Sequence, residues 1–254
     1  MSGPPPVVTR HDGVAVVRDD LFPGGTKARF LPALYRGADE VVYASPAEGG
    51  AQTALAHTAA ALGKRATIFV AKRAQPHPRA LEAKRVGARV YQVSPGYLTV
   101  VQARAREYCA RTGARLAPFG VDLPEAIKAI AEAARATGLD PDEVWCASGS
   151  GVLARGLAAA WPRARRHVVE VGRALSPADV ADATIHKAGV PFGRPERERP
   201  PFPSDPHYDA KAWRVCKARR GAGLVVLWNV TGPANPMRND LLPHLGRDIA
   251  MPSP

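Results

Sequence analysis

The sequence predicts an α/β fold in which mainly parallel sheets are flanked by helices. Short β-rich runs alternate with alanine-rich helical runs over most of the 254 residues, and strands separated by helices are the pattern of βαβ units. Residues 224–229, Leu-Val-Val-Leu-Trp-Asn, are apolar almost throughout, which is typical of a central parallel strand. Apolar residues make up 46% of the chain, enough for a sizeable core.

The individual elements follow from hydrophobic periodicity and from segment length. Strands are expected at 40–45, 66–71, 88–93, 143–147, 167–171 and 224–229. Helices are expected at 50–62, 77–86, 98–111, 123–137 and 152–160. Residues 187–206 break the alternation with six prolines. Because proline is excluded from helix interiors and central strands, we expect a long surface connection there, which can act as a lid.

The charge of the chain allows two interpretations. The formal net charge is +12, which fits either a solvated basic surface or a polyanionic partner such as DNA. The basic residues cluster at Arg163-Arg165-Arg166, at Arg194-Arg197-Arg199 and at Arg214-Lys217-Arg219-Arg220. No apolar run is long enough to span a bilayer, no secretory signal is visible, and the three cysteines have no metal-ligand spacing. We therefore expect a cytoplasmic protein with reduced thiols, no metal and no membrane contact.

A glycine pair precedes a lysine in residues 18–29, Arg-Asp-Asp-Leu-Phe-Pro-Gly-Gly-Thr-Lys-Ala-Arg. The two glycines permit a tight turn, and Lys27 then begins a helix. A lysine at a helix N-terminus near other cationic groups has a lowered pKa, which favours the neutral amine that forms a Schiff base. Lys27 is therefore a candidate nucleophile; a solvated surface lysine is the alternative.

Two later segments carry further candidates. Residues 144–153, Val-Trp-Cys-Ala-Ser-Gly-Ser-Gly-Val-Leu, predict a strand, a small-residue loop and a helix whose first N–H groups can hold a phosphate. A plain strand-to-helix turn is the alternative. Residues 204–212, Ser-Asp-Pro-His-Tyr-Asp-Ala-Lys-Ala, offer Tyr208 for proton transfer and Asp209 for a cationic ring nitrogen. A helix N-cap is the alternative there.

In this order, the three segments resemble the tryptophan-synthase-β-like (fold type II) family of pyridoxal-phosphate (PLP) enzymes. The nearest branch is that of aminocyclopropane-carboxylate deaminase and D-cysteine desulfhydrase. The resemblance implies that Lys27 forms the Schiff base with PLP, that Tyr208 is a second acid or base, and that Asp209 or Thr231 contacts the pyridine nitrogen. The implied phosphate-binding residues are Ser148, Gly149, Ser150, Gly151, Val152 and Leu153.

The resemblance also implies a two-lobed fold and a homodimer. The larger, PLP-binding lobe is expected to comprise residues 1–45 and 138–254, and the smaller lobe residues 46–137, with PLP in the cleft between the lobes. Most of the chain takes part in the resemblance, although it is shorter than typical members of the family.

One loop departs from the family pattern, which is Gly-Gly-x-Gln-Ser-Asn. A gap-free match places residues 45–50, Ser-Pro-Ala-Glu-Gly-Gly, in this loop, so that glycines replace the serine and the asparagine. A shifted match would keep a hydroxyl group at Thr53. The expected substrate-binding residues are Ser45, Gly49, Gly50, Gln52 and Thr53. The glycines leave room for an unusual substrate and leave mainly backbone N–H groups for its carboxylate.

Three functions fit these observations. The first is a PLP-dependent lyase of deaminase, desulfhydrase or decarboxylase type, which activates the Cα of a small amino acid. The second is a PLP enzyme that remodels or decarboxylates an amino-acid group on a DNA base, similar to enzymes placed in bacteriophage pathways for hypermodified thymine. The third is a non-catalytic nucleic-acid-binding protein on a degenerate PLP scaffold.

Overall fold

The computed structural model describes residues 3–234, which divide by their contacts into two compact units. Unit 1 comprises the residues up to Phe30 together with Gly120–Pro233, and unit 2 comprises Leu31–Phe119. The boundaries expected at 45/46 and 137/138 differ from this division. Strand β3 (Glu40–Ser45) pairs with strands of unit 2, and helix α4 (Pro124–Ala136) packs on helix α5 (Val152–Ala160) of unit 1.

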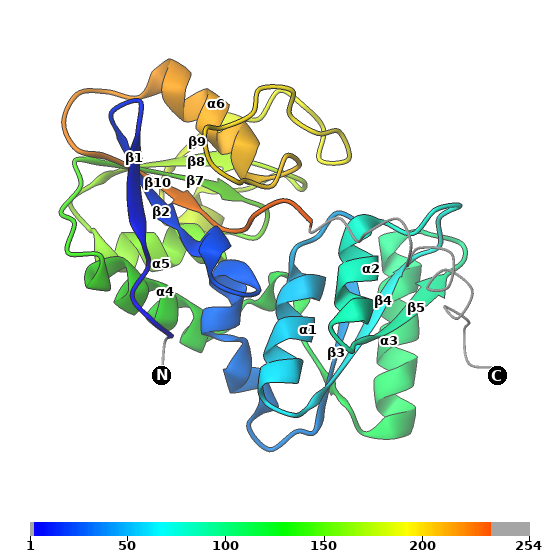
Figure 1. Cartoon of the computed structure of the whole chain (residues 1–254). Coiled ribbons are helices and arrows are strands. Elements are labelled where there is room, and N and C mark those ends of the chain that lie inside the picture. The colour runs from blue at the N-terminus through cyan, green and yellow to red at the C-terminus, as the bar shows by residue number, and fades with distance from the viewer. Residues whose placement is uncertain (1–2, 235–254) are drawn as a thin grey trace. The chain divides into compact units, whose positions relative to one another are not determined.

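Unit 1 is built on a six-stranded sheet. In spatial order its strands are β1 (Val8–His11), β2 (Val14–Arg18), β10 (Val225–Asn229), β7 (Glu143–Ser148), β8 (Arg165–Glu170) and β9 (Thr184–Lys187). Only β1 is antiparallel to its neighbour. Helix α6 (Asp209–Arg219) covers one face of this sheet and α4 with α5 the other (Figure 1). The core of the α6 face includes the fully buried Trp145, Trp213 and Leu227.

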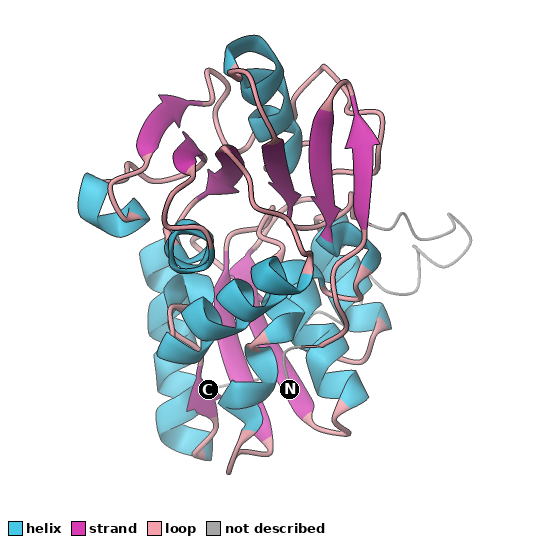
Figure 2. Ribbon diagram, turned by 90° about the vertical axis from the view of Figure 1, so that its left-hand side faces the viewer, coloured by secondary structure: helices cyan, strands magenta, loops and turns pink. Residues whose placement is uncertain are grey.

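Unit 2 is built on a four-stranded parallel sheet. Its spatial order is β5 (Arg89–Val93), β4 (Arg65–Ala71), β3 and β6 (Arg115–Leu116). Its helices are α1 (Ala51–Ala61), α2 (Pro78–Arg85) and α3 (Leu98–Thr112), and Figure 2 distinguishes them from the strands by colour. Helix α3 packs Val101, Ala105 and Tyr108 on one face of the sheet, and α1 and α2 pack on each other.

Each of the expected strands and helices has a counterpart in the structure, with ends shifted by at most two residues. The fold class predicted from the sequence is confirmed. Strands β1, β2, β6 and β9 and helix α6 were not expected. The β1–β2 hairpin does have a sequence signal: Asp12 and Gly13 have φ of 48° and 75°, as in the Asp-Gly turns that join short hairpins.

The proline-rich residues 188–206 contain no helix or strand, as expected of a connection. Side chains at the start of α6 hold this segment, which lies beside that helix in Figure 1. Lys211 Nζ donates to Pro191 O at 2.9 Å, and Arg214 Nε donates to Glu196 Oε2 at 2.8 Å. No helix within residues 3–234 is long and apolar enough to cross a membrane.

Candidate active site of unit 1

The glycine turn before Lys27 is required by a close backbone approach. Gly24 and Gly25 have φ of 85° and 68°, in the left-handed region that favours glycine. A Cβ atom on Gly25 would lie 2.3 Å from the carbonyl oxygen of Val230. The next residue, Thr26, donates its N–H to the same oxygen at 3.0 Å. The turn therefore holds the short 3-10 helix Gly25–Arg29, and Lys27 with it, against the end of β10.

A buried carboxylate fixes this short helix in place. Asp19 is fully buried and accepts hydrogen bonds from Thr26 Oγ1 at 2.8 Å and from Trp228 Nε1 at 3.2 Å. It also forms an ion pair with the guanidinium group of Arg29, at 2.5 Å from Nη2. Asp19, Arg29 and Trp228 were assigned no role from the sequence. The Arg-Asp-Asp-Leu string, which contains Asp19, was the only local signal for this cluster. Trp228 lies about two hundred residues from Asp19 in the sequence, so no local pattern links the two residues.

Lys27 itself is partly buried, and among residues 3–234 no side-chain hydrogen bond or ion pair engages its nitrogen. Burial lowers the pKa of Lys27 below its ordinary value, and the carboxylate of Asp209 opposes this shift. A lysine nitrogen becomes nucleophilic only when it is neutral. The environment of Lys27 is thus suited to attack on a carbonyl carbon.

Asp209, the first residue of α6, is a fully buried carboxyl group. Its Oδ2 accepts the N–H of Thr231 at 3.2 Å. Its Oδ1 is buried and has no hydrogen-bond partner among the described residues. Burial raises the pKa of Asp209 well above its ordinary value, and the nearby Asp205 raises it further. An orphaned buried carboxylate oxygen calls for a donor, and a protonated pyridine nitrogen fits that need.

Tyr208 precedes Asp209 and is partly buried. Burial raises the pKa of its phenol, and the carboxylate of Asp209 adds to the rise. A hydrogen bond from the backbone of Gly149 acts in the opposite direction. The phenol therefore keeps its proton at neutral pH, and it lies next to the 148–153 loop.

The 148–153 loop joins the end of β7 to the start of α5 and depends on small residues. Ser148 Oγ accepts the N–H of Gly151 at 2.8 Å. Gly151 has a φ of 86°, and a Cβ atom there would lie 1.8 Å from Asp179 O. The first turn of α5 contains no acidic residue, and the first N–H groups of a helix have no partner within it. These groups and the helix dipole fit a phosphate.

One pocket within unit 1 brings most of the predicted residues together. Its lining includes Lys27, Ser148, Ser150, Val152, Leu153 and Tyr208, together with Thr26, Phe30, Gly120, Ile130 and Val230. Gly149 and Gly151 complete the loop. Asp209 and Thr231 do not line the pocket, although they follow its residues Tyr208 and Val230 directly in sequence. A lysine, a phosphate cradle, a phenol and an adjacent buried carboxyl group match the chemistry of PLP.

The predicted substrate-binding residues belong to unit 2. Ser45 ends β3, Gly49 and Gly50 precede α1, and Gln52 and Thr53 lie in its first turn. The side chains of Ser45, Gln52 and Thr53 are buried. Each donates a hydrogen bond to a backbone carbonyl group of the same segment. The segment therefore presents backbone rather than side-chain groups.

Comparison with known proteins places these features in a family. Residues 14–200 match the family model described as pyridoxal-phosphate dependent enzyme. The fold is similar to an ACC deaminase homologue, at 20% identity and a TM-score of 0.75, covering 91% of this chain and 88% of that one.

Two further structures are similar at low identity. The threonine deaminase from T.th. is 19% identical with a TM-score of 0.66, covering 92% of this chain and 94% of that one. Escherichia coli diaminopropionate ammonia lyase is 15% identical with a TM-score of 0.61, covering 93% and 80%. No curated protein matches the sequence significantly. At these identities the structural likeness concerns the fold.

Proposed function

Because the chain belongs to the family of pyridoxal-phosphate dependent enzymes, we propose that it activates the Cα of an amino-acid substrate, with Lys27 as the lysine that holds the cofactor. Family membership confirms the cofactor that the sequence predicted. The proposal for this chain rests on one observation: a single pocket of unit 1 is lined by Lys27, the 148–153 loop and Tyr208. The ammonia lyase and the deaminases among the similar structures favour a lyase or deaminase reaction.

Each residue then has a distinct task. The N–H groups at the start of α5 would hold the phosphate, and Asp209, whose Oδ1 has no hydrogen-bond partner among the described residues, would keep the pyridine nitrogen protonated. When bound, PLP supplies an electron sink for negative charge at Cα. Lys27, whose pKa is lowered by burial, accepts and returns the Cα proton, and Tyr208 donates a proton as the second acid.

The test is the visible absorption of the purified protein after incubation with PLP. We expect the band typical of lysine-bound PLP in the wild-type protein, and we expect Lys27→Ala to abolish it because no other amine replaces Nζ. Lys128→Ala is the matched control, since its side chain is 79% exposed on α4. A colourless wild-type protein would overturn the proposal and favour a non-catalytic scaffold.

A second candidate is favoured by the distribution of arginines in unit 1. Among the described residues, Arg163, Arg165 and Arg214 are engaged in ion pairs, so the basic clusters are partly neutralised. In the proline-rich segment and the last residues of α6 with its C-cap, five exposed guanidinium groups have no ion pair or hydrogen bond among residues 3–234: Arg194, Arg197, Arg199, Arg219 and Arg220. These arginines belong to the proline-rich segment and to the end of α6. The ion pair between Lys217 of α6 and Glu198 of the segment joins the two. A basic surface of this kind favours the hypothesis that the substrate is an amino-acid group attached to DNA.

Two further expectations belong with the proposal. We expect a homodimer and a cytoplasmic location, both on the family resemblance and the composition. The oligomeric state in solution is measured directly by light scattering.

A further inference from the structure

The proline-rich segment of unit 1 is held by two side chains at the start of α6. Lys211 is fully buried, and its Nζ donates to Pro191 O at 2.9 Å. The Nδ1 of His207 lies 3.0 Å from Phe192 O, and it is the donor because a carbonyl oxygen only accepts. The ring of Phe192 also lies 5.9 Å from Lys211 Nζ, within the range of a cation–π contact. Two successive carbonyl groups of the segment are therefore fixed beside α6.

The contacts of the segment lie on both sides of Tyr208 and Asp209 in the sequence. Glu196 of the segment donates its backbone N–H to Pro206 O at 2.7 Å, just before the two residues. Phe192 and Tyr208 both pack against the buried cluster on the α6 face of the sheet. The phenol and the carboxyl group assigned to the cofactor site are thus carried by a turn to which the proline-rich segment is bound.

The same segment presents cations to solvent. Its two glutamates, Glu196 and Glu198, form ion pairs with side chains of α6 at 2.8 Å and 3.3 Å. By contrast, Arg194, Arg197 and Arg199 are exposed, and among residues 3–234 their guanidinium groups have no ion pair or hydrogen bond. Guanidinium groups pair well with phosphate oxygens, so this part of the segment fits the phosphate backbone of DNA.

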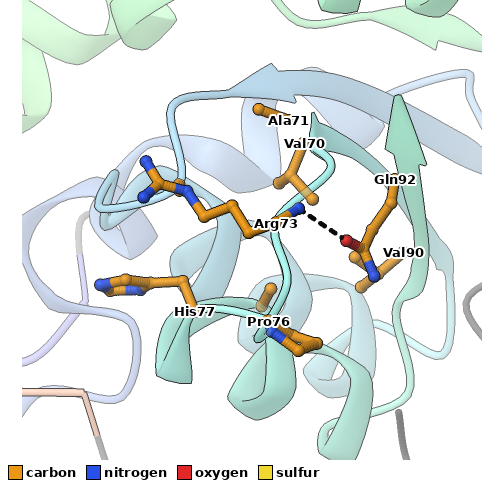
Figure 3. A pocket seen from close by; sticks show the side chains of 9 residues that line it. Val70, Ala71, Arg73, Pro76, His77, Val90 and Gln92 are labelled. Carbon is orange, nitrogen blue, oxygen red and sulfur yellow. Dashed lines mark hydrogen bonds between the residues drawn. The ribbon is translucent and has the colours of Figure 1, made fainter. Parts of the chain in front are cut away.

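An arginine of unit 2 provides a paired counterpart. Figure 3 shows Arg73 beside a small pocket that Val90 and Gln92 also line. The backbone N–H of Arg73 donates to Gln92 Oε1 at 3.1 Å, which the dashed line in Figure 3 marks. Its guanidinium group pairs with Glu48 at 2.8 Å. Because a carboxylate already compensates its charge, Arg73 is a matched control for the arginines of the proline-rich segment.

The docked position of the segment has a modest local stability. Residues 189–201 are exposed or half-buried throughout and contain no helix or strand, and regions with little buried surface open locally at low cost in free energy. A ligand that binds the docked segment shifts this equilibrium toward docking. A second ligand that needs the same docked state then meets a smaller ordering cost, which is positive cooperativity.

We propose that the proline-rich segment couples two ligands: DNA, bound through its phosphate backbone by the three arginines of the segment, and PLP, bound beside Tyr208, raise each other's affinity. Lys211 and His207 are positioning residues in this coupling, because they join the segment to the residues that flank Tyr208 and Asp209. The coupling rests on the proposed function and adds a regulator to it, whether the substrate is a free amino acid or one attached to DNA.

The test measures Kd for PLP by the visible band, without DNA and with a short duplex at saturation. We expect Kd for PLP to be at least about fivefold lower with the duplex, and PLP to tighten duplex binding by the same factor. The triple change Arg194→Ser, Arg197→Ser, Arg199→Ser should remove the effect of the duplex on Kd. Arg73→Ser should leave it unchanged.

The ratio of the two PLP constants distinguishes coupling from a merely structural role. Lys211→Met removes the bond to Pro191 O while an unbranched side chain still fills the buried site, and it should bring the ratio close to one. A purely structural role would weaken PLP binding equally with and without the duplex. His207→Leu provides a second variant if Lys211→Met does not fold, and Lys128→Met, at a side chain that is 79% exposed on α4, is the control.

The possible outcomes separate this coupling from the proposed function. A wild-type protein that gives the PLP band but does not bind the duplex would overturn the coupling alone. The same holds if the bound duplex leaves Kd for PLP unchanged or raises it, or if the folded Lys211 and His207 variants keep the wild-type ratio. A wild-type protein without the visible band would overturn the proposed function, and the coupling with it.

Discussion

Asp209 illustrates how a single buried group can serve function at the expense of stability. Its carboxyl group is fully buried, with one oxygen unpaired among the described residues. Burial raises the pKa of Asp209 well above the ordinary 3.8, so the folded chain holds this proton more tightly than the unfolded chain does. The free energy of unfolding of the apoprotein therefore falls as pH rises from about the ordinary value through the raised one.

This linkage gives a prediction for Asp209→Asn. Because asparagine cannot ionise, the apo variant should have a higher free energy of unfolding than wild type at neutral pH, and the difference should vanish below the ordinary pKa. Its affinity for PLP should fall, since the protonated pyridine nitrogen loses its anionic partner. Urea unfolding across the pH range and a PLP titration measure the two effects. Asp140→Asn, at an exposed site, is the control, and a stability difference independent of pH would contradict this account.

At the scale of the element, the glycine turn before Lys27 depends on the strand behind it. A positive φ alone costs an L-residue about 1–2 kcal/mol. At Gly25 a side chain would also meet Val230 O at 2.3 Å, whereas at Gly138, with nearly the same φ of 69°, nothing lies within 4 Å. Comparing alanine substitutions at Gly25 and Gly138 therefore separates the cost of backbone strain from the cost of the close approach to Val230 O.

We expect Gly138→Ala to lower the free energy of unfolding by about 1 kcal/mol, and Gly25→Ala by at least about 2 kcal/mol more. Gly25→Ala should also weaken PLP binding, because the 3-10 helix that carries Lys27 must move away from β10. Denaturant unfolding and the visible band measure both effects. Equal losses at the two positions would show that the turn is not held against the strand as described.

At the scale of the whole molecule, DNA binding depends less on the net charge of +12 than on which individual arginines are left without an ion pair. If the five unengaged guanidinium groups of the proline-rich segment and the end of α6 each neutralise a phosphate, the logarithm of the DNA-binding constant should fall with the logarithm of salt concentration with a slope of about −4.5. The triple change Arg194→Ser, Arg197→Ser, Arg199→Ser should reduce this slope by about 2.7.

Fluorescence anisotropy with a labelled duplex measures both slopes. Arg104→Ser is the control, since Arg104 lies on α3 of unit 2 and pairs with Glu107. Binding that does not respond to salt, or turnover of free amino acids alongside untouched amino-acid-bearing DNA, would exclude the second candidate function.

The sequence by itself determined the order and type of most elements and the three segments that identify the family. These features are local: periodicity, small-residue loops and the lysine after a glycine pair are encoded within a few residues of each other. The same reasoning identified Lys27, Tyr208 and the 148–153 loop, which line the pocket of unit 1. It did not find α6 as an element, because that helix combines buried and charged positions without a clear apolar stripe.

Only the tertiary structure decided what supports the site. Asp19 meets Trp228 from the other end of the chain, Arg79 of α2 reaches Thr53 of α1, and Gly25 is required by the carbonyl group of Val230, which directly follows β10. The pairing of the basic clusters and the boundaries of the two units were decided in the same way. The physical reason is that local patterns specify backbone conformation, whereas burial, ion pairing and close approach depend on which distant residues the packed fold brings together.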